Sequence, residues 1–310
     1  MKNKYVFAKL SKLDCTGVRL GGAGLGNILF PWARSVVFAN KHNLVLINTT
    51  WRSLKVGPIF RGELDTRGYS DIFKENNISG IKKFLLLLFG KRIKEKDIKY
   101  DQESYSIRPK ILLFSGMKNQ MKDIMYDHKI VKQELLNIIT KNNMDSIKHF
   151  DGNGISIHIR MGDFYTPSSE VEIREGKTNC RLPINWYVSI IKKLRAHIGQ
   201  EIKVNVFSDG TDKELQDIVN LSGVKRYYFG SAIADMIALS KSDILIASNS
   251  TFSLWASYLG QLPTIWFPGT HKINLFNTNK IYEGELDYND EINPLLKKAL
   301  FELFISHKDT

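Results

Sequence analysis

The segment 154–164, GISIHIRMGDF, brings a histidine, an arginine and an aspartate together within six residues at the end of an apolar run. Its isoleucines alternate, so a strand here would place His158 and Arg160 on the opposite face, near the strand's end. The guanidinium of Arg160 can bind a diphosphate with two parallel hydrogen bonds, a geometry that lysine does not supply. An ion pair between Arg160 and Asp163 is the alternative interpretation. A metal site at His158 is not expected, because the seven histidines of the chain are scattered singly.

Polar side chains also follow two further apolar runs. Asp209 comes just after the run 204–207, and the run 244–247 is followed by a group of hydroxyl and amide side chains. The members of this group taken as candidates are Asn249, Ser250, Thr251 and Ser253. Such residues are common helix N-caps, and they are also the groups that bind phosphate oxygens or a ribose. Asp235, near the start of the preceding helix, is either a first-turn acid serving the helix dipole or a carboxylate that accepts two N–H bonds from a guanine edge.

A glycine-rich turn, GGAGLG at 21–26, precedes a helical pattern in the first half of the chain. The turn lacks the G-x-G-x-x-G spacing of a dinucleotide loop, and the sequence contains no G-x-x-x-x-G-K-[ST] phosphate loop. Two interpretations remain. The turn either offers free N–H groups and a positive helix end to an anion, or its glycines meet only steric needs. A run ending in Leu20 is expected to lead into this turn, and 44–48 is expected to form a second strand.

From residue 154 onward, short apolar runs alternate with helical patterns. The expected strands are 154–159, 204–207, 224–229, 244–247 and 264–267, and the expected helices are 183–198, 212–220, 233–240 and 252–259. This alternation predicts an α/β fold with a parallel sheet covered on both faces. Such sheets bind ligands at the carboxyl ends of their strands. A turn-rich break at 148–153 predicts two domains, 1–150 and 151–310, while the lysine-rich segment 65–140 receives no assignment.

The composition is that of an ordinary globular protein, with 43% hydrophobic and 25% charged residues. Its two cysteines, without C-x-x-C spacing, argue against a zinc site or a disulfide framework. The N-terminus does not resemble a signal peptide, and no run approaches the ~20 apolar residues of a membrane span. These observations predict a cytoplasmic protein.

The net charge of +12 indicates an anionic partner: nucleic acid, an anionic membrane surface or a phosphorylated small molecule. Nucleic acid is not expected, because the sequence has neither the aromatic and basic interleaving of an RNA-recognition motif nor a recognition-helix signature. Part of the charge surrounds the apolar run 84–89 within the segment 82–96. This segment is either an interfacial element that touches anionic lipid or a buried helix with solvated, lysine-rich ends.

Three blocks in a fixed order resemble motifs of the bacterial and eukaryotic α-1,2-fucosyltransferases. The run GLGN at 24–27, with Phe30 and Ala33, is similar to the N-terminal motif of that family. HIRMGDF at 158–164 resembles its arginine-containing strand end, and Asp235 with NSTFSLW at 249–255 resembles its third motif. Three ordered motifs are far more specific than any one of them.

The resemblance implies a GT-B architecture, in which two Rossmann-like domains with parallel sheets face a cleft. It implies GDP-L-fucose as the donor, inversion at the sugar carbon, and no required metal or other cofactor. By position, Arg160 would bind the β-phosphate, while His158 and Asp235 would read the guanine. The remaining candidates would line the nucleotide-sugar site: Ser250, Thr251 and Ser253 at phosphate or ribose, with Asp209, Asn249, Gly24, Gly26 and Asn27.

Three positions depart from the family's pattern. Met161 stands where the family has a second arginine, Ile28 where it has a glutamine, and Leu254 where it has a tryptophan. These departures leave open a related GDP-linked 6-deoxy sugar such as colitose. Asp163 is the expected catalytic base, because an inverting transfer needs a carboxylate or histidine near the acceptor hydroxyl. Orienting Arg160 is the alternative role of Asp163.

The expected function is the transfer of L-fucose to a hydroxyl of an oligosaccharide, through an α-1,2 linkage, in the synthesis of a bacterial surface polysaccharide such as O-antigen. A lipid-linked acceptor would explain the basic segment 82–96 and a peripheral position on the cytoplasmic face of the inner membrane. The rival interpretations are another nucleotide-sugar on the same fold, a non-catalytic sugar-nucleotide sensor and a basic nucleic-acid-binding protein.

Overall fold

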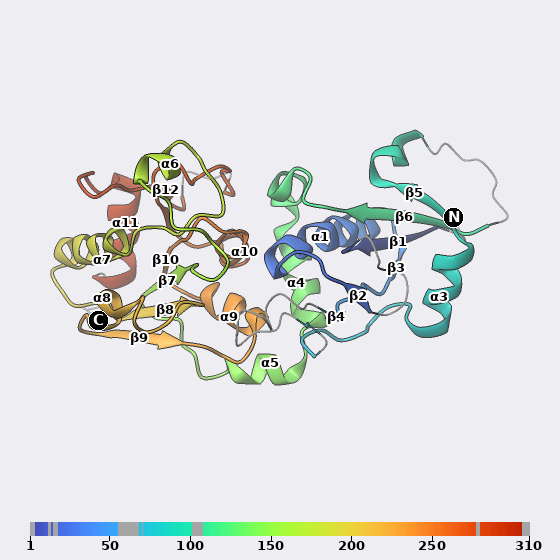
Figure 1. Cartoon of the computed structure of the whole chain (residues 1–310), viewed down its shortest axis with the longest axis horizontal. Helices are drawn as coiled ribbons and strands as arrows, with labels where there is room; N and C mark the ends of the chain where they lie inside the picture. Colours follow the sequence, from blue (N-terminus) through green and yellow to red (C-terminus); the bar gives the residue numbers. More distant parts are fainter. Residues whose placement is uncertain are drawn as a thin grey trace. The chain divides into compact units, whose positions relative to one another are not determined.

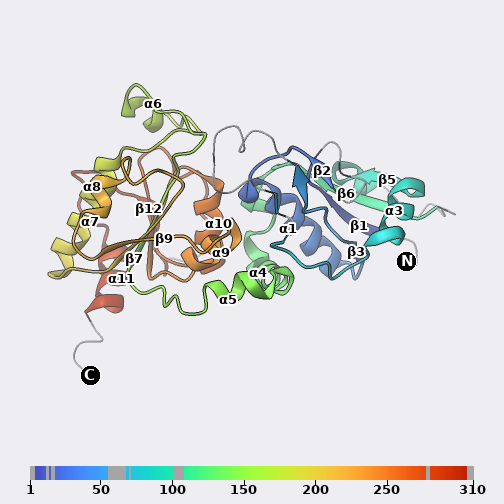
Figure 2. The same cartoon turned by 60° about the horizontal axis from the view of Figure 1, so that its bottom comes forward.

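The chain forms two compact units, Met1–Asp145 and Ser146–Thr310, seen as ribbons in Figures 1 and 2. The structure is a computed structural model that describes residues 4–11, 14, 18–54, 68, 69, 71–100, 108–276 and 280–305. Of the two cysteines, Cys15 lies outside these ranges, and Cys180 is buried with a free thiol. No helix within these ranges is long and apolar enough to cross a lipid bilayer.

The C-terminal unit is built on a six-stranded sheet in the order β12-β11-β10-β7-β8-β9, with every neighbouring pair parallel. The strands are β7 (Ile155–Ile159), β8 (Val204–Ser208), β9 (Val224–Tyr227), β10 (Ile244–Ile246), β11 (Thr264–Trp266) and β12 (Glu283–Glu285). The first five are those expected from the sequence. The edge strand β12 was not expected, because its Glu-Gly-Glu sequence lacks the apolar character by which the others were found.

The connections between these parallel strands contain α6 (Glu170–Arg174), α7 (Ile184–Ile198), α8 (Gln216–Val219), α9 (Ala232–Leu239) and α10 (Thr251–Gly260). A further helix, α11 (Pro294–Phe304), follows the last strand, β12. The prediction of a helix over 212–220 was too long. Glu214 bends back to accept hydrogen bonds from the backbone N–H and the hydroxyl of Thr211, at 2.8 and 2.9 Å. The Glu214 N–H in turn donates to the Thr211 hydroxyl at 3.3 Å, which makes the pair an N-terminal capping box. Residues 212–215 form turns after this cap, and regular helix runs only from Gln216 to Val219.

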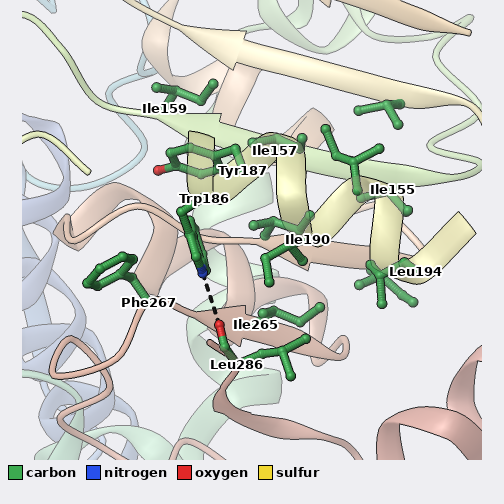
Figure 3. Close-up of a cluster of buried hydrophobic side chains, with 14 of the residues drawn as sticks. Ile155, Ile157, Ile159, Trp186, Tyr187, Ile190, Leu194, Ile265, Phe267 and Leu286 are labelled. Carbon is green, nitrogen blue, oxygen red and sulfur yellow. Dashed lines mark hydrogen bonds between the residues drawn. The ribbon is translucent and has the colours of Figure 1, made fainter. Parts of the chain in front are cut away.

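The core of the C-terminal unit holds β7 in place (Figure 3). Ile155, Ile157 and Ile159 point to the face covered by α7, as the alternating pattern predicted. On α7, the fully buried Trp186 donates a hydrogen bond from Nε1 to the carbonyl of Leu286 at 2.9 Å. Burying an indole requires such a partner for its N–H. The strand that carries the histidine and arginine candidates is therefore packed on a rigid layer.

The N-terminal unit has a four-stranded parallel sheet in the order β3-β1-β6-β5. Its strands are β1 (Lys4–Lys9), β3 (Val45–Ile47), β5 (Lys91–Lys94) and β6 (Lys110–Ser115). The strand expected to lead into the glycine turn is β2 (Arg19–Leu20), but it pairs only with β4 (Ser53–Leu54) in a separate two-stranded sheet. The strand that precedes the turn in the main sheet is β1, which the lysines and tyrosine at its start obscured.

Two helices cover opposite faces of this sheet. α1 (Leu25–Lys41) lies along β1 and β6 (Figures 1 and 2), where Ala39 packs with Val6 and Leu112. α3 (Gly80–Phe89) contacts the other face, where Leu87 packs with Phe7, Ile47 and Ile111. The unit is completed by α4 (His128–Ile138) and α5 (Lys141–Ser146), and by the 3₁₀ turns η1 (Glu95–Tyr100), η2 (Gln120–Asp123) and η3 (Met125–Asp127).

Candidate functional site

The strand order of the C-terminal unit creates a topological switch point beside β7. From β7 the chain moves to β8 and β9 on one side, and it then crosses to β10, which pairs with the other side of β7. In doubly wound sheets the connections at such a point leave in opposite directions, so ligands bind at the adjoining carboxyl ends. His158 is the second-last residue of β7, Arg160 follows this strand, Asp209 follows β8, and the polar group at 248–253 follows β10.

His158 and three serines form a buried hydrogen-bonded group between the ends of β7 and β10. The His158 Nδ1 lies 2.8 Å from the Oγ atoms of both Ser248 and Ser253, and 3.4 Å from that of Ser250. Ser253 is fully buried, and its Oγ also accepts the N–H of Ser248 at 3.0 Å. The imidazole stacks on Phe252, with ring centroids 4.7 Å apart. The ring is therefore held in position on several sides.

This enclosure determines the charge of the histidine. Burial, assisted by the positive charge of Arg160, lowers the pKa of His158 to about 3. Burial removes the water that would stabilise a charged imidazole, and the hydrogen bonds of the neighbouring serine hydroxyls do not replace that stabilisation. His158 therefore acts at neutral pH as an uncharged donor and acceptor of hydrogen bonds. An uncharged imidazole can form hydrogen bonds with the polar edge of a ligand such as a base. It does not supply a positive charge for a phosphate.

The helix α10 begins inside the same group. Ser250 is its N-cap, and the Ser250 Oγ accepts the N–H of Ser253 at 3.3 Å. Thr251 is the first residue of the helix, and Asn249 donates from Nδ2 to the carbonyl of Lys177 at 3.0 Å. The N-cap interpretation of these residues is correct for Ser250, while the Asn249 amide anchors the loop that carries Lys177. The positive end of the helix lies at the same edge, where it favours an anion.

Arg160 lies at the end of β7 between two carboxylates. Its guanidinium forms ion pairs with Asp163 and with Asp209, and it sits 5.3 Å from the centre of the Phe164 ring. Asp209, which follows β8, also accepts the N–H of Met161 through Oδ1 at 2.7 Å. The ion pair between Arg160 and Asp163 that the sequence suggested is thus present. Asp209 is a second partner of Arg160, and this contact was not predicted. The Asp163 carboxylate is turned toward Arg160.

Two residues next to Arg160 explain how this arrangement fits. A Cβ on Gly162 would overlap Oδ2 of Asp209 and lie 3.3 Å from the guanidinium carbon of Arg160. A glycine at position 162 therefore lets the acid and the guanidinium meet. Met161, where the resembling family has a second arginine, is only 6% exposed and belongs to the hydrophobic core. In this chain, position 161 supplies packing instead of a charge.

Asp235 lies in the first turn of α9, four residues after the N-cap. Its Oδ1 accepts the N–H of Phe229 at 2.7 Å, which ties the end of β9 to the helix. The N-cap of α9 is Ser231, whose Oγ accepts the N–H of Ala234 at 3.3 Å. Asp235 is thus an acid in the first turn of the helix, as one interpretation expected, and its contact with the Phe229 N–H was not predicted. A role in reading guanine stays a prediction.

The glycine turn is the candidate element of the N-terminal unit. Gly24 is the N-cap of α1, Gly26 is buried in its first turn, and the N–H of Asn27 donates to the Gly24 carbonyl at 3.1 Å. Gly22 has a φ of +104°, and a Cβ there would overlap the guanidinium of Arg19. Arg19 is fully buried and donates from Nη1 to the carbonyl of Gly21 at 2.8 Å. The steric interpretation thus holds for Gly22, and anion binding by the turn remains a prediction.

Sequence reasoning missed two contributors to the C-terminal group. Phe252 was noted only as part of a motif, although its ring forms one wall of the His158 environment. Ser248 was noted as a hydroxyl, but only the fold reveals its contact with the histidine 90 positions away. Within the described ranges, no three histidine, cysteine, aspartate or glutamate side chains gather closely enough to hold a metal ion. The independence from metal stays an expectation.

A guanidinium, a helix N-terminus and hydroxyls at the switch point of a parallel sheet form a candidate site for a phosphate-containing ligand in an α/β protein. The chain belongs to glycosyl transferase family 11, whose sequence model matches residues 98–280. This match confirms the resemblance deduced from the motifs, although the block at 24–33 lies outside the matched range. The protein is therefore a glycosyltransferase. Comparison with curated proteins gives no match.

Solved structures support the same fold. The NodZ α-1,6-fucosyltransferase soaked with GDP-fucose is similar with a TM-score of 0.50 and 15% identity, over 86% of this chain and 95% of that chain. The same enzyme co-crystallised with GDP gives a TM-score of 0.50 and 14% identity over equal shares. FUT1 of Arabidopsis thaliana, in complex with GDP, has a TM-score of 0.48 and 15% identity, over 86% of this chain and 70% of that chain. The similarity to the two NodZ structures confirms the expected α/β fold of GT-B type.

Proposed function

We propose that this protein is an inverting fucosyltransferase that moves L-fucose from GDP-L-fucose to a sugar hydroxyl. Its membership of glycosyl transferase family 11 supports sugar transfer. The NodZ structure with the same fold was soaked with GDP-fucose, and this supports the donor. The single observation that carries the proposal is the position of Arg160 and the α10 N-terminus at two adjoining strand ends.

The donor diphosphate binds between these two positive groups. Arg160 contacts the β-phosphate, and the N–H groups at the start of α10, with Ser250 and Thr251, receive phosphate or ribose oxygens. Negative charge grows on the β-phosphate as its bond to the sugar breaks, so a preorganised guanidinium stabilises the transition state more than the ground state. No metal ion is needed for that step. Asp209 holds the guanidinium in place: one of its oxygens pairs with Arg160, and the other accepts the N–H of Met161, which fixes the carboxylate.

Guanine binds to an uncharged imidazole and a carboxylate. His158, uncharged because of its burial, presents a hydrogen-bonding edge, and Asp235 accepts the N–H groups that distinguish guanine from other bases. Asp209 and Asn249 complete the C-terminal side of the site. Gly24, Gly26 and Asn27 form the proposed substrate-binding element of the N-terminal unit. The alternative donor is a related GDP-linked 6-deoxy sugar such as colitose.

Asp163 is the proposed base. Its carboxylate takes the proton of the acceptor hydroxyl as that oxygen attacks the anomeric carbon of fucose, and the bond from that carbon to the phosphate oxygen breaks to release GDP. This single displacement inverts the anomeric configuration. Because the acceptor oxygen attacks from the side opposite the leaving phosphate, this role requires the Asp163 carboxylate to leave its ion pair with Arg160 and turn toward the acceptor.

The proposed acceptor is a hydroxyl of an oligosaccharide, linked α-1,2, in a bacterial surface polysaccharide such as O-antigen. The oligosaccharide is carried on a lipid at the cytoplasmic face of the inner membrane. The support for this acceptor is the resemblance to α-1,2-fucosyltransferases and the basic, apolar segment 82–96.

The deciding experiment incubates the protein with a panel of GDP-sugars and oligosaccharide acceptors and detects products by mass spectrometry. Transfer from GDP-L-fucose is expected, and transfer from a different GDP-sugar alone would refute the fucose assignment. Thermal unfolding in the presence of GDP, UDP or ADP tests which nucleobase the site recognises. A nucleotide present at a hundred times its Kd should stabilise the folded protein by about 2.7 kcal/mol. Stabilisation by UDP but not by GDP would contradict the roles of His158 and Asp235.

Arg160→Lys tests the phosphate contact. The change keeps the charge but removes the two-pronged guanidinium, and kcat/KM is expected to fall about a hundredfold or more. Arg174→Lys is a matched control, because Arg174 also joins two carboxylates, Glu170 and Asp287, and sits 5.1 Å from an aromatic ring. Equal losses in both variants, or transfer by Arg160→Lys at the native rate, would show that Arg160 has only a structural role.

A further inference from the structure

We propose that α3 and the basic residues next to it form a docking surface for an anionic lipid bilayer. This surface, called the α3 face below, is independent of the donor site and lies in the N-terminal unit. Its apolar members are Ile81, Phe84, Leu85, Leu88 and Phe89. Its basic members are Lys82, Lys91, Arg92, Lys94 and Lys96.

The apolar stripe of α3 faces solvent. The five apolar members recur at i, i+3, i+4, i+7 and i+8, the spacing that a surface helix normally turns toward its core. Here they are exposed: Ile81 by 79%, Phe89 by 61% and Leu88 by 56%. Twelve large apolar side chains are exposed among the described residues, and five of them lie in this one helix. Such clustering marks an interaction surface, whereas scattered exposed apolar residues are ordinary.

The opposite side of the helix fixes this orientation. Leu87 is 3% exposed and packs with Phe7 and Ile111 under the sheet. Lys83 is also buried, donates from Nζ to the Thr50 hydroxyl at 2.7 Å, and lies 5.5 Å from the centre of the Phe7 ring. Rolling the helix to bury its outer stripe would break the Lys83 hydrogen bond. Figures 1 and 2 show α3 at the periphery of the N-terminal ribbon.

The charges around the stripe select an anionic lipid surface. All five basic members are exposed, and Arg92 caps the helix end by donating to the Leu87 carbonyl at 2.6 Å. Glu95 is the only acidic residue in the segment 82–96, and it is bound to Arg34 at 2.8 Å. Lysine is depleted in protein–protein interfaces, so a lysine-rich border favours lipid over a protein partner. A helix of ten residues is too short to span a bilayer and lies in the interfacial plane.

The α3 face accounts for both interpretations of the segment 82–96. The segment does contain a helix with solvated basic ends, as one interpretation expected, but the greater part of its apolar surface is not buried. Contact with a bilayer removes that surface from water and brings the basic members near anionic headgroups. Each basic residue close to such a surface strengthens binding by about fivefold, and physiological or higher salt weakens it.

The test is vesicle flotation with the full chain. Vesicles of phosphatidylcholine alone are compared with vesicles of phosphatidylcholine and phosphatidylglycerol in equal amounts. Binding to the anionic vesicles is expected, at least tenfold tighter than to the neutral ones and reduced by salt. Phe84→Ser combined with Leu88→Ser should weaken it about tenfold or more. The control, Val171→Ser with Phe301→Ser, removes equally exposed apolar side chains elsewhere and should bind as the native protein does.

Charge is tested separately. Lys91→Glu with Lys94→Glu should lower binding to anionic vesicles by about twentyfold or more, whereas Lys129→Glu, an exposed charge reversal on α4, should have little effect. Native circular dichroism spectra verify the folding of every variant. Absence of binding to anionic vesicles, or unchanged binding by both α3 variants, would overturn the proposal. So would a native dimer without vesicle affinity that Phe84→Ser with Leu88→Ser converts to monomer, because the α3 face would then contact protein.

Discussion

The burial of His158 makes a quantitative prediction about acid stability. The pKa of His158 is about 3 in the folded protein and 6.5 for the free side chain, because burial among Ser248, Ser253 and Phe252 opposes the charged form. Below pH 6.5 the unfolded chain binds a proton that the folded protein does not. This part of the stability is fully present above pH 6.5 and is lost as the pH falls from 6.5 toward about 3.

The expected magnitude follows from these two values. One pH unit below the pKa of the unfolded state, at about pH 5.5, the unfolded chain is stabilised by about 1.4 kcal/mol relative to the folded one. At about pH 7.5 the same effect is below about 0.1 kcal/mol. His158→Gln keeps a hydrogen-bonding side chain but cannot titrate. The stability difference between the native protein and this variant should therefore change by about 1.4 kcal/mol between the two pH values.

Urea unfolding followed by tryptophan fluorescence measures this difference, with Trp186 and Trp255 reporting on the C-terminal unit. His197→Gln is the control, because the His197 side chain is exposed on α7 and changes its surroundings little on unfolding. A pH-independent difference between native protein and His158→Gln would refute the reasoning. It would mean that the imidazole can be protonated in the folded protein, and so that the serine group is open to water.

Two further variants examine the geometry around the site. Gly162→Ala places a methyl group where Oδ2 of Asp209 lies, so Arg160 and Asp209 should be displaced. We expect sugar transfer to fall about tenfold or more with little change in Tm, since a small misplacement of a transition-state contact is costly; native kinetics would show that this ion pair does not position Arg160. Ser253→Ala leaves the Ser248 N–H without its acceptor and removes a partner of His158. Thermal unfolding should show a loss of about 1–3 kcal/mol, and a neutral effect would mean that water replaces the hydroxyl.

Much of the C-terminal unit could be predicted because its local signals agree. The runs of isoleucine and valine are strands, and a proline or serine opens the helices that follow. Parallel strands bury both faces, so their apolar character is strong and easy to find. The N-terminal unit was harder, since β1 starts with lysine and tyrosine, and β5 consists of three basic residues around Ile93. β5 is an edge strand, and edge strands tolerate such polarity. β1 lies inside the sheet, but its buried stretch, Val6–Ala8, is only three residues long and gives a weak signal.

The types of side chain at the candidate site could be predicted from the sequence alone. An arginine and an aspartate after one strand, and hydroxyls before a helix, were visible as residue types at strand ends. Their meaning depended on contacts between residues distant along the chain, which local patterns do not encode. Asp209 joined Arg160 from 49 positions away, and Ser253 joined His158 from 95 positions away.

The charge state and the orientation of the candidate side chains depend on the tertiary structure. His158 is neutral because folding removes water from its ring, a property of its surroundings that residue type cannot express. The same holds for segment 82–96: its amphipathic pattern fixes which residues share a helix face, but the pattern is equally compatible with that face turned inward. The burial of Lys83 and Leu87 against the sheet turned the apolar stripe outward. Local sequence therefore specifies which side chains share a strand or a helix face, and packing between distant segments specifies whether that face meets the core, a neighbouring group or solvent.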